Sequence, residues 1–148
     1  MQMVMPLWAR VWSALGLLAL SSAFAGSTLP ARAAETVAAG PDWGQAQTVT
    51  VRLTEYRFIP SHLLFRHDLP YHLHLVNPGK EAHEFTAAAF FATVTLRAPA
   101  TSMVVNGDVY LRPGEAADLY FVPQQTGQYD LRCADHDWAG MVGDIVVE

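Results

Sequence analysis

A single cysteine lies close to a histidine and a methionine near the C-terminal end of the sequence. Cys133, His136 and Met141 follow one another in the spacing C-x2-H-x4-M. A thiolate, an imidazole and a thioether form a donor set that suits copper. A blue-copper centre places one thiolate and two imidazoles in a trigonal plane with a weak axial thioether. The spacing therefore predicts a copper site that needs one further histidine from elsewhere in the chain.

His83 is the best candidate for that further histidine. It lies 50 residues before Cys133, shortly after an alternating apolar segment that ends at the turn signal Asn77-Pro78-Gly79. A β-sandwich can bring two such loops together at one end. One ligand then comes from a distant strand end and three from one loop, so the packed protein fixes the geometry. Copper can change its oxidation state in such a site with little rearrangement, as fast electron transfer requires.

Each of these residues also has an ordinary structural interpretation. A buried cysteine is most often inert, a histidine near a turn is often only a surface residue, and Met141 alternatively belongs to the core. A Cys-His-His set also suits zinc, with water or Asp137 in place of the thioether. Zinc makes little use of a thioether, so four donors in this order favour copper.

Alternating apolar residues predict a series of short β-strands. The apolar positions recur at every second residue in five segments: 48–53, 71–75, 117–121, 129–133 and 143–147. Proline and glycine separate the segments at intervals of roughly ten residues, a pattern typical of an antiparallel β-sandwich or barrel. Only residues 86–92 have the composition of a short helical turn. We therefore expect an all-β fold.

Side-chain parity within these segments gives two further expectations. The apolar set changes parity between Leu53 and Tyr56, which predicts a β-bulge near Thr54. Cys133 has the parity of Leu131, so its thiol is expected to point inward.

The first 33 residues have the pattern of a secretory signal peptide. A short start with one cation precedes an apolar run over 11–24, and small-x-small sites predict cleavage after Ala33 or, alternatively, after Ala25. The apolar run is shorter than the ~20 residues that a membrane-spanning helix needs, which disfavours an uncleaved anchor. We interpret 34–47 as a flexible leader and 48–148 as a single domain. The sequence thus predicts an exported, soluble domain without stable membrane insertion after cleavage. We further expect it to be a monomer and to reside in the periplasm.

The composition excludes several classes of protein. With 51% hydrophobic residues and 148 residues in all, the chain is neither a disordered tail nor a multi-domain assembly. A net charge of −5 without a run of lysine or arginine argues against nucleic-acid binding. The single cysteine excludes an internal disulfide and a CxxC redox pair. An exported lone thiol tends to oxidise, so we expect Cys133 to be buried or metal-bound.

The motifs together resemble the cupredoxin family of type 1 blue copper proteins. The resemblance covers 48–148 and is carried by four patterns: N-x5-H-x-F from Asn77, G-x-Y-x3-C from Gly127, C-x2-H-x4-M from Cys133, and G-x-I-x-V from Gly143. The ligand-loop spacing is that of plastocyanins and pseudoazurins, and the HEF stretch is similar to bacterial periplasmic cupredoxin-like proteins, some of them linked to copper tolerance. The resemblance implies a Greek-key β-sandwich and one type 1 copper ion with ligands His83, Cys133, His136 and Met141.

Two residues near these ligands have open interpretations. Plastocyanins have an asparagine after the upstream histidine that ties the two ligand loops together, whereas this chain has Glu84. Either the Glu84 carboxylate accepts a backbone hydrogen bond in its place, or the tie is absent. Trp138 belongs either to an apolar docking patch around His136 or to the packing of the ligand loop.

His72 and His74 lie two residues apart in one alternating segment. Residues two apart share one face of a strand, close enough to chelate a second metal ion. Their ordinary interpretation is the polar face of an outer strand, and an accessory copper site is the alternative.

Two functions remain open from the sequence. The first is a periplasmic electron carrier that exchanges single electrons with redox partners such as a cytochrome or an oxidase. The second is a copper-binding protein for copper tolerance, sequestration or delivery. Neither a GxSxG nor an HExxH motif is present, so we do not expect an enzyme.

Overall fold

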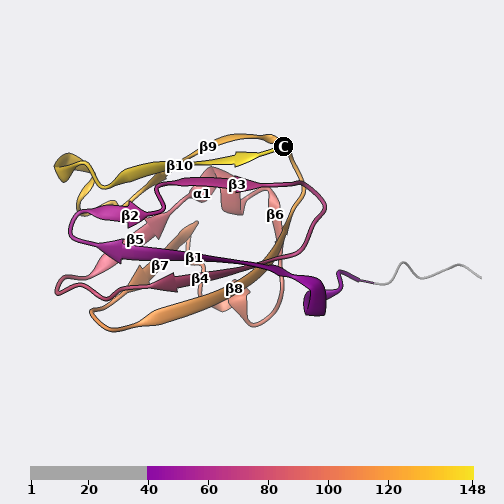
Figure 1. Cartoon of the computed structure of the whole chain (residues 1–148), viewed down its shortest axis with the longest axis horizontal. Coiled ribbons are helices and arrows are strands. Elements are labelled where there is room, and N and C mark those ends of the chain that lie inside the picture. The colour runs from indigo at the N-terminus through magenta and orange to yellow at the C-terminus, as the bar shows by residue number, and fades with distance from the viewer. Residues whose placement is uncertain (1–39) are drawn as a thin grey trace, which may run out of the picture. The chain divides into compact units, whose positions relative to one another are not determined.

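The computed structural model describes residues 40–148, which form a sandwich of two five-stranded β-sheets (Figure 1). Sheet A has the strand order β2-β1-β4-β8-β6, and sheet B has the order β3-β10-β9-β5-β7. The strands are β1 (Gln47–Thr54), β2 (Arg57–Ile59), β3 (His62–Phe65), β4 (Tyr71–Val76), β5 (His83–Thr86), β6 (Val94–Leu96), β7 (Asp108–Leu111), β8 (Ala116–Pro123), β9 (Gly127–Arg132) and β10 (Val142–Val147).

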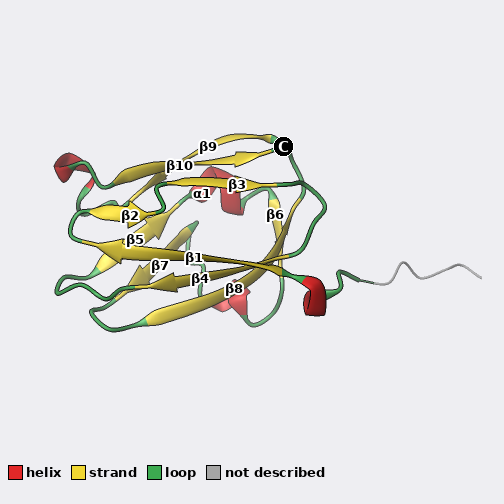
Figure 2. Cartoon of the chain, in the orientation of Figure 1, coloured by secondary structure: helices red, strands yellow, loops and turns green. Residues whose placement is uncertain are grey.

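Helical structure in the described residues is short (Figure 2). The helix α1 (Ala88–Phe91) confirms the helical turn expected at 86–92. Three 3-10 turns complete the set: η1 (Trp43–Gln45), η2 (Ala100–Ser102) and η3 (Asp137–Ala139). The turns η1 and η3 lie at opposite ends of the sandwich in Figure 2, so the ligand loop containing η3 caps one end only.

The expected all-β Greek-key sandwich is confirmed, with one correction to its strand directions. Most neighbouring strands are antiparallel, but β1 pairs parallel with β4, and β10 pairs parallel with β3. After β1 the chain forms β2, crosses to the other sheet as β3, and returns as β4 in the direction of β1. Apolar alternation reports which face of a strand is buried and carries no information on the direction of its neighbour.

The β-bulge expected near Thr54 is wrong. Strand β1 ends at Thr54, and β2 returns antiparallel to it with Leu53 opposite Phe58. The intervening Glu55 and Tyr56 form the turn of a hairpin, which explains the change of parity without a bulge.

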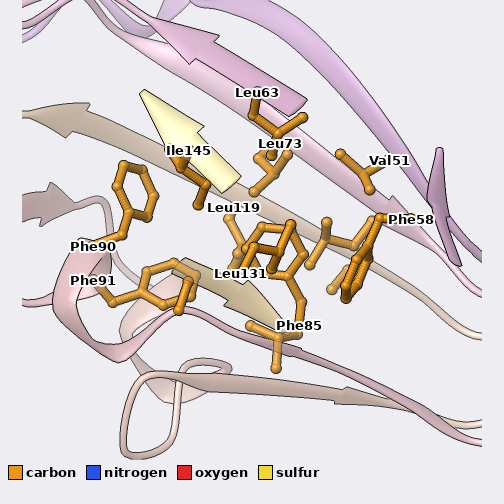
Figure 3. Packing of buried hydrophobic residues seen from close by; sticks show 14 of the residues in the cluster. Val51, Phe58, Leu63, Leu73, Phe85, Phe90, Phe91, Leu119, Leu131 and Ile145 are labelled. Carbon is orange, nitrogen blue, oxygen red and sulfur yellow. The ribbon is translucent and has the colours of Figure 1, made fainter. Parts of the chain in front are cut away.

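Inward-facing side chains from both sheets form one hydrophobic core (Figure 3). The α1 residue Phe90 stacks on Phe65 at 5.8 Å and meets the edge of Phe121 at 5.3 Å. Such aromatic pairs add about 0.5–1.5 kcal/mol each to the burial of their surface. The inward parity of the predicted strands is confirmed by a set of fully buried residues: Val51, Leu53, Leu73, Leu75, Leu119, Phe121 and Ile145. The core therefore holds the strand ends, from which the candidate ligands extend, in fixed positions.

The expected signal peptide at 1–33 and the first part of the expected leader lie outside the described residues. Among the last leader residues, Asp42 caps η1 by accepting from the N–H of Gly44. The Trp43 ring also packs edge-on against Tyr120, with ring centroids 6.3 Å apart. Within 40–148 no helix is long and apolar enough to span a membrane.

Gly143 lies where β10 passes the end of β3. The neighbouring N–H of Asp144 donates to the carbonyl of Ser61 at 2.9 Å, and a Cβ at position 143 would collide with that same carbonyl oxygen. The contact is with backbone, which cannot rotate out of the way.

We predict that Gly143→Ala lowers the free energy of unfolding by about 1–3 kcal/mol, the usual cost of overpacking. Gly40→Ala is the matched control, because no atom lies within 4 Å of its added Cβ. Urea unfolding measures both variants. Equal stability of the two would contradict the close approach of β10 to Ser61.

Candidate metal centre

Three of the four predicted ligands converge at one end of the sandwich. His83 begins β5, Cys133 follows β9, and His136 precedes η3. Ligand atoms of these three side chains all lie within 4.8 Å of one another. The Cys133 sulfur is 3.4 Å from Nδ1 of His136. The ring centroids of His83 and His136 are 5.1 Å apart. A thiol and two imidazoles thus come together as the sequence predicts.

The imidazole of His83 lacks hydrogen-bond partners. Among the buried side-chain nitrogen and oxygen atoms of residues 40–148, the two ring nitrogens of His83 are the ones without a hydrogen-bond partner. Leaving one such group unsatisfied costs about 1–3 kcal/mol. Burial, followed by the charge of His136, lowers the pKa of His83, which favours the neutral ring with a lone pair to donate. A metal ion would bind the lone pair of one nitrogen of a buried, neutral imidazole in this position.

The Cys133 thiol is equally suited to a metal. Burial raises the pKa of Cys133, which disfavours a free thiolate in the absence of a cation. A metal ion reverses that balance because it binds the thiolate directly. The sulfur also accepts a hydrogen bond from the backbone N–H of Glu84 at 3.3 Å. The donor set of this site therefore fits copper.

Met141 is buried immediately before β10. Its carbonyl accepts from the N–H of Cys133 at 3.0 Å, and its N–H donates to the carbonyl of His136 at 3.2 Å. Between His136 and Met141, η3 ends at Ala139 and is followed by Gly140, which adopts a left-handed φ of 88°. These bonds close the segment 133–141 into a compact loop whose two ends lie side by side.

Asn77 fixes the loop before His83. Its amide nitrogen donates to the carbonyls of Glu81 and Leu111 at 2.8 and 2.9 Å, and its Oδ1 accepts from the N–H of Gly79. The side chain is fully buried. An asparagine that appears in the sequence as a turn residue thus connects the His83 loop to the end of β7.

Glu84 ties the two ligand loops together. Its Oε2 accepts from the backbone N–H of Asp135 at 3.2 Å, while its own N–H donates to the Cys133 sulfur. Of the two alternatives open from the sequence, the structure has the tie. Burial, followed by the charges of Asp108 and Asp135, raises the pKa of Glu84.

Sequence reasoning missed Glu81 and Tyr56. Oε2 of Glu81 lies 3.1 Å from Nε2 of His136, and Oε1 accepts from the Tyr56 hydroxyl at 3.1 Å. The ring centroids of Tyr56 and His136 are 4.9 Å apart. A carboxylate at the outer nitrogen of a ligating histidine orients the ring and raises its basicity. Glu81 is two residues before His83 in the sequence, but its position over His136 depends on the fold.

Glu55 supports the same loop. Its Oε1 accepts from the backbone N–H groups of Lys80 and Glu81, which lowers the pKa of Glu55. The same oxygen is 3.9 Å from Nε2 of His83. Two carboxylates therefore lie close to the two candidate imidazole ligands.

Trp138 lies on the outer side of the ligand loop. Its side chain is 79% exposed, and its indole N–H donates to the carbonyl of Asp135 at 2.8 Å. The ring centroids of Trp138 and Tyr56 are 6.4 Å apart. The indole is thus anchored to the loop at one edge and open to solvent over most of its surface.

Solved auracyanin structures share the fold of this chain. Auracyanin B aligns with a TM-score of 0.51 and 23% identity over 70% of this chain and 89% of that one. Dithionite-reduced auracyanin from the photosynthetic bacterium Roseiflexus castenholzii aligns with the same TM-score and 13% identity over 70% and 98%. The chain has the cupredoxin fold. No family model and no curated protein matches its sequence, so the likeness to these proteins is one of fold.

We predict opposite effects of His83→Leu on the metal-free and copper-loaded domain. Without metal the variant is more stable than the native chain by about 1–3 kcal/mol, because leucine needs no hydrogen-bond partner. When the Cu(II) concentration is 1,000 times the dissociation constant of this centre, the native chain gains about 4 kcal/mol more by mass action than the variant, in which only Cu(II) bound elsewhere stabilises the fold.

Thermal unfolding with and without Cu(II) measures both effects. His62→Leu is the control, since His62 is exposed and paired with Asp144. An undiminished copper response in His83→Leu would exclude His83 as a ligand.

Proposed function

We propose that this protein carries single electrons on one type 1 copper ion held by His83, Cys133, His136 and Met141. The observation that carries the proposal is the partnerless, buried imidazole of His83 beside Cys133 and His136. The cupredoxin fold supports it, since the auracyanin of R. castenholzii is itself described in a dithionite-reduced state. When bound, copper supplies the one-electron couple between Cu(I) and Cu(II).

The chain's own residues keep the donors in one arrangement. Asn77 fixes the His83 loop, and Glu84 joins that loop to the Cys133 segment. The N–H of Glu84 also withdraws charge from the sulfur. Because these hydrogen bonds do not depend on the metal, the donors do not have to rearrange when the charge of the site changes. Pre-positioned donors of this kind favour rapid electron transfer over metal exchange.

His136 provides the shortest connection from the proposed site to solvent. Its side chain is 14% exposed, whereas His83, Cys133 and Met141 are fully buried. Tyr56 and Trp138 lie around it and form a partly apolar surface. We propose that a redox partner protein, such as a cytochrome or an oxidase, docks there. The signal-like pattern of the first 33 residues supports the periplasm as the location.

A role in copper tolerance, sequestration or delivery is the alternative. Delivery requires ligands that a recipient can reach and displace. Three of the four proposed donors are fully buried, which favours the carrier. The two functions differ in whether the protein keeps its copper.

Electron self-exchange, measured by NMR line broadening in mixtures of the reduced and oxidised protein, tests the carrier function. We predict rapid exchange, and retention of copper in both oxidation states against Cu(I) and Cu(II) chelators. Trp138→Ala is expected to slow exchange tenfold or more, as truncation of an interface tryptophan commonly costs about 2 kcal/mol or more.

Leu64→Ala is the matched control, because Leu64 is an exposed apolar residue on β3. Its exchange rate is expected to equal that of the native chain. Slow exchange together with ready loss of copper to the chelators would contradict the carrier and favour copper handling.

A further inference from the structure

A second group of metal-binding side chains lies on the outer face of sheet A. In β4 the side chains of Tyr71, Leu73 and Leu75 point into the core, so His72 and His74 point outward. Asp118 on the neighbouring strand β8 is directly opposite His74. Ligand atoms of the two histidines and the aspartate all lie within 4.8 Å of one another.

The three side chains converge on a single oxygen. Nε2 of His72 and Nδ1 of His74 are each hydrogen-bonded to Oδ1 of Asp118 at 2.7 Å. Two imidazole nitrogens and a carboxylate oxygen are donors that divalent transition-metal ions such as zinc and Cu(II) accept. A tetrahedral ion with bonds near 2.0–2.1 Å separates its donor atoms by about 3.3 Å. Binding thus needs the two 2.7 Å contacts with Oδ1 of Asp118 to lengthen by about half an ångström and the two ring nitrogens, now within 4.8 Å, to lie about 3.3 Å apart.

The ring of His72 is already oriented for this role. Its Nδ1 is hydrogen-bonded to the Thr48 hydroxyl at 3.3 Å, which leaves Nε2 directed at Asp118. The ring also stacks on Tyr120, with centroids 4.4 Å apart and planes within 5°. A hydrogen bond at the outer nitrogen is the usual support of a ligating histidine.

The group is open to solvent on its outer side. The side chains of His72, His74 and Asp118 are 21%, 33% and 55% exposed. Asp118 and Tyr120 also line a hollow of ≈ 390 Å³ next to Arg97. A metal ion can therefore enter directly and complete its coordination with water. The Arg97 guanidinium, 5.3 Å from the Tyr120 ring centre, is a nearby positive charge that limits the affinity.

We propose that His72, His74 and Asp118 form a second site that binds one divalent transition-metal ion through two nitrogens and one oxygen. Its donors belong to β4 and β8 and are not shared with the centre formed by His83, Cys133 and His136. It lies toward the end of the sandwich where Trp43 of η1 packs on Tyr120, and the ligand loop with η3 is at the other end (Figure 2). The inference does not rest on electron transfer at the sulfur-containing centre.

Equilibrium dialysis against Zn(II) tests the proposal on the native chain, His74→Gln, Asp118→Asn and His62→Gln. His62 is the matched control, because it is also an exposed strand histidine bonded to an aspartate, Asp144, but has no second histidine beside it. We expect the native chain and His62→Gln to bind one more zinc ion per chain than the other two variants, whose affinity for that ion falls at least tenfold.

All four proteins keep His83, Cys133 and His136, so any zinc bound there contributes equally and cancels from the difference. Urea unfolding checks that His74→Gln and Asp118→Asn remain folded, as expected for substitutions on an exposed face. Equal zinc binding by the native chain and His74→Gln would overturn the second site, whatever the copper centre does. Loss of the ion in His62→Gln alone would overturn it as well.

Discussion

The central constraint on this structure is a buried imidazole that has no hydrogen-bond partner. His83 is enclosed at the start of β5 with both ring nitrogens unsatisfied, beside a thiol whose ionisation burial also disfavours. Neither feature stabilises the metal-free chain. Both become favourable when a cation binds the neutral imidazole and the thiolate. Burying these donors without a metal costs free energy on folding. The rest of the molecule must therefore be stable enough to hold them in place.

That stability comes from the core and from hydrogen bonds on the ligand loops. The aromatic packing of Phe65, Phe90 and Phe121 fixes the two sheets, while Asn77 and Glu84 fix the segments that extend beyond them. The carboxylates of Glu55 and Glu81 lie against the two imidazoles. Negative charge at the periphery of a site favours the more positive oxidation state of its metal. These two glutamates are therefore part of the electrostatic environment of the proposed copper couple.

Sequence patterns predicted what depends on local periodicity and missed what depends on sheet order. Alternation correctly places Leu131 and Cys133 on the inner face and His72 and His74 together on the outer face. It carries no information on the parallel pairing of β1 with β4, and the parity change at Tyr56 fits a bulge as well as the observed hairpin. Apolar alternation is a local pattern, so it also does not predict contacts between segments that are distant in the sequence.

In the candidate sites, too, local spacing is visible in the sequence and contacts between distant segments are not. The spacing of Cys133, His136 and Met141 lies within one loop and is visible in the sequence. The approach of Glu81 to His136 joins two loops, and the approach of Asp118 to His74 requires β4 and β8 to be neighbours. Only the assembled sandwich brings these side chains together.

The proposed copper site combines the sulfur of Cys133 with the imidazoles of His83 and His136. The visible absorption and electron paramagnetic resonance spectra of the Cu(II)-loaded protein, recorded beside a Cys133→Ser variant, test it most directly. We predict an intense thiolate-to-copper absorption band that gives a blue or green colour and is absent from the variant. A colourless protein that binds Cu(II) only through nitrogen and oxygen, with the same spectra in both chains, would contradict it.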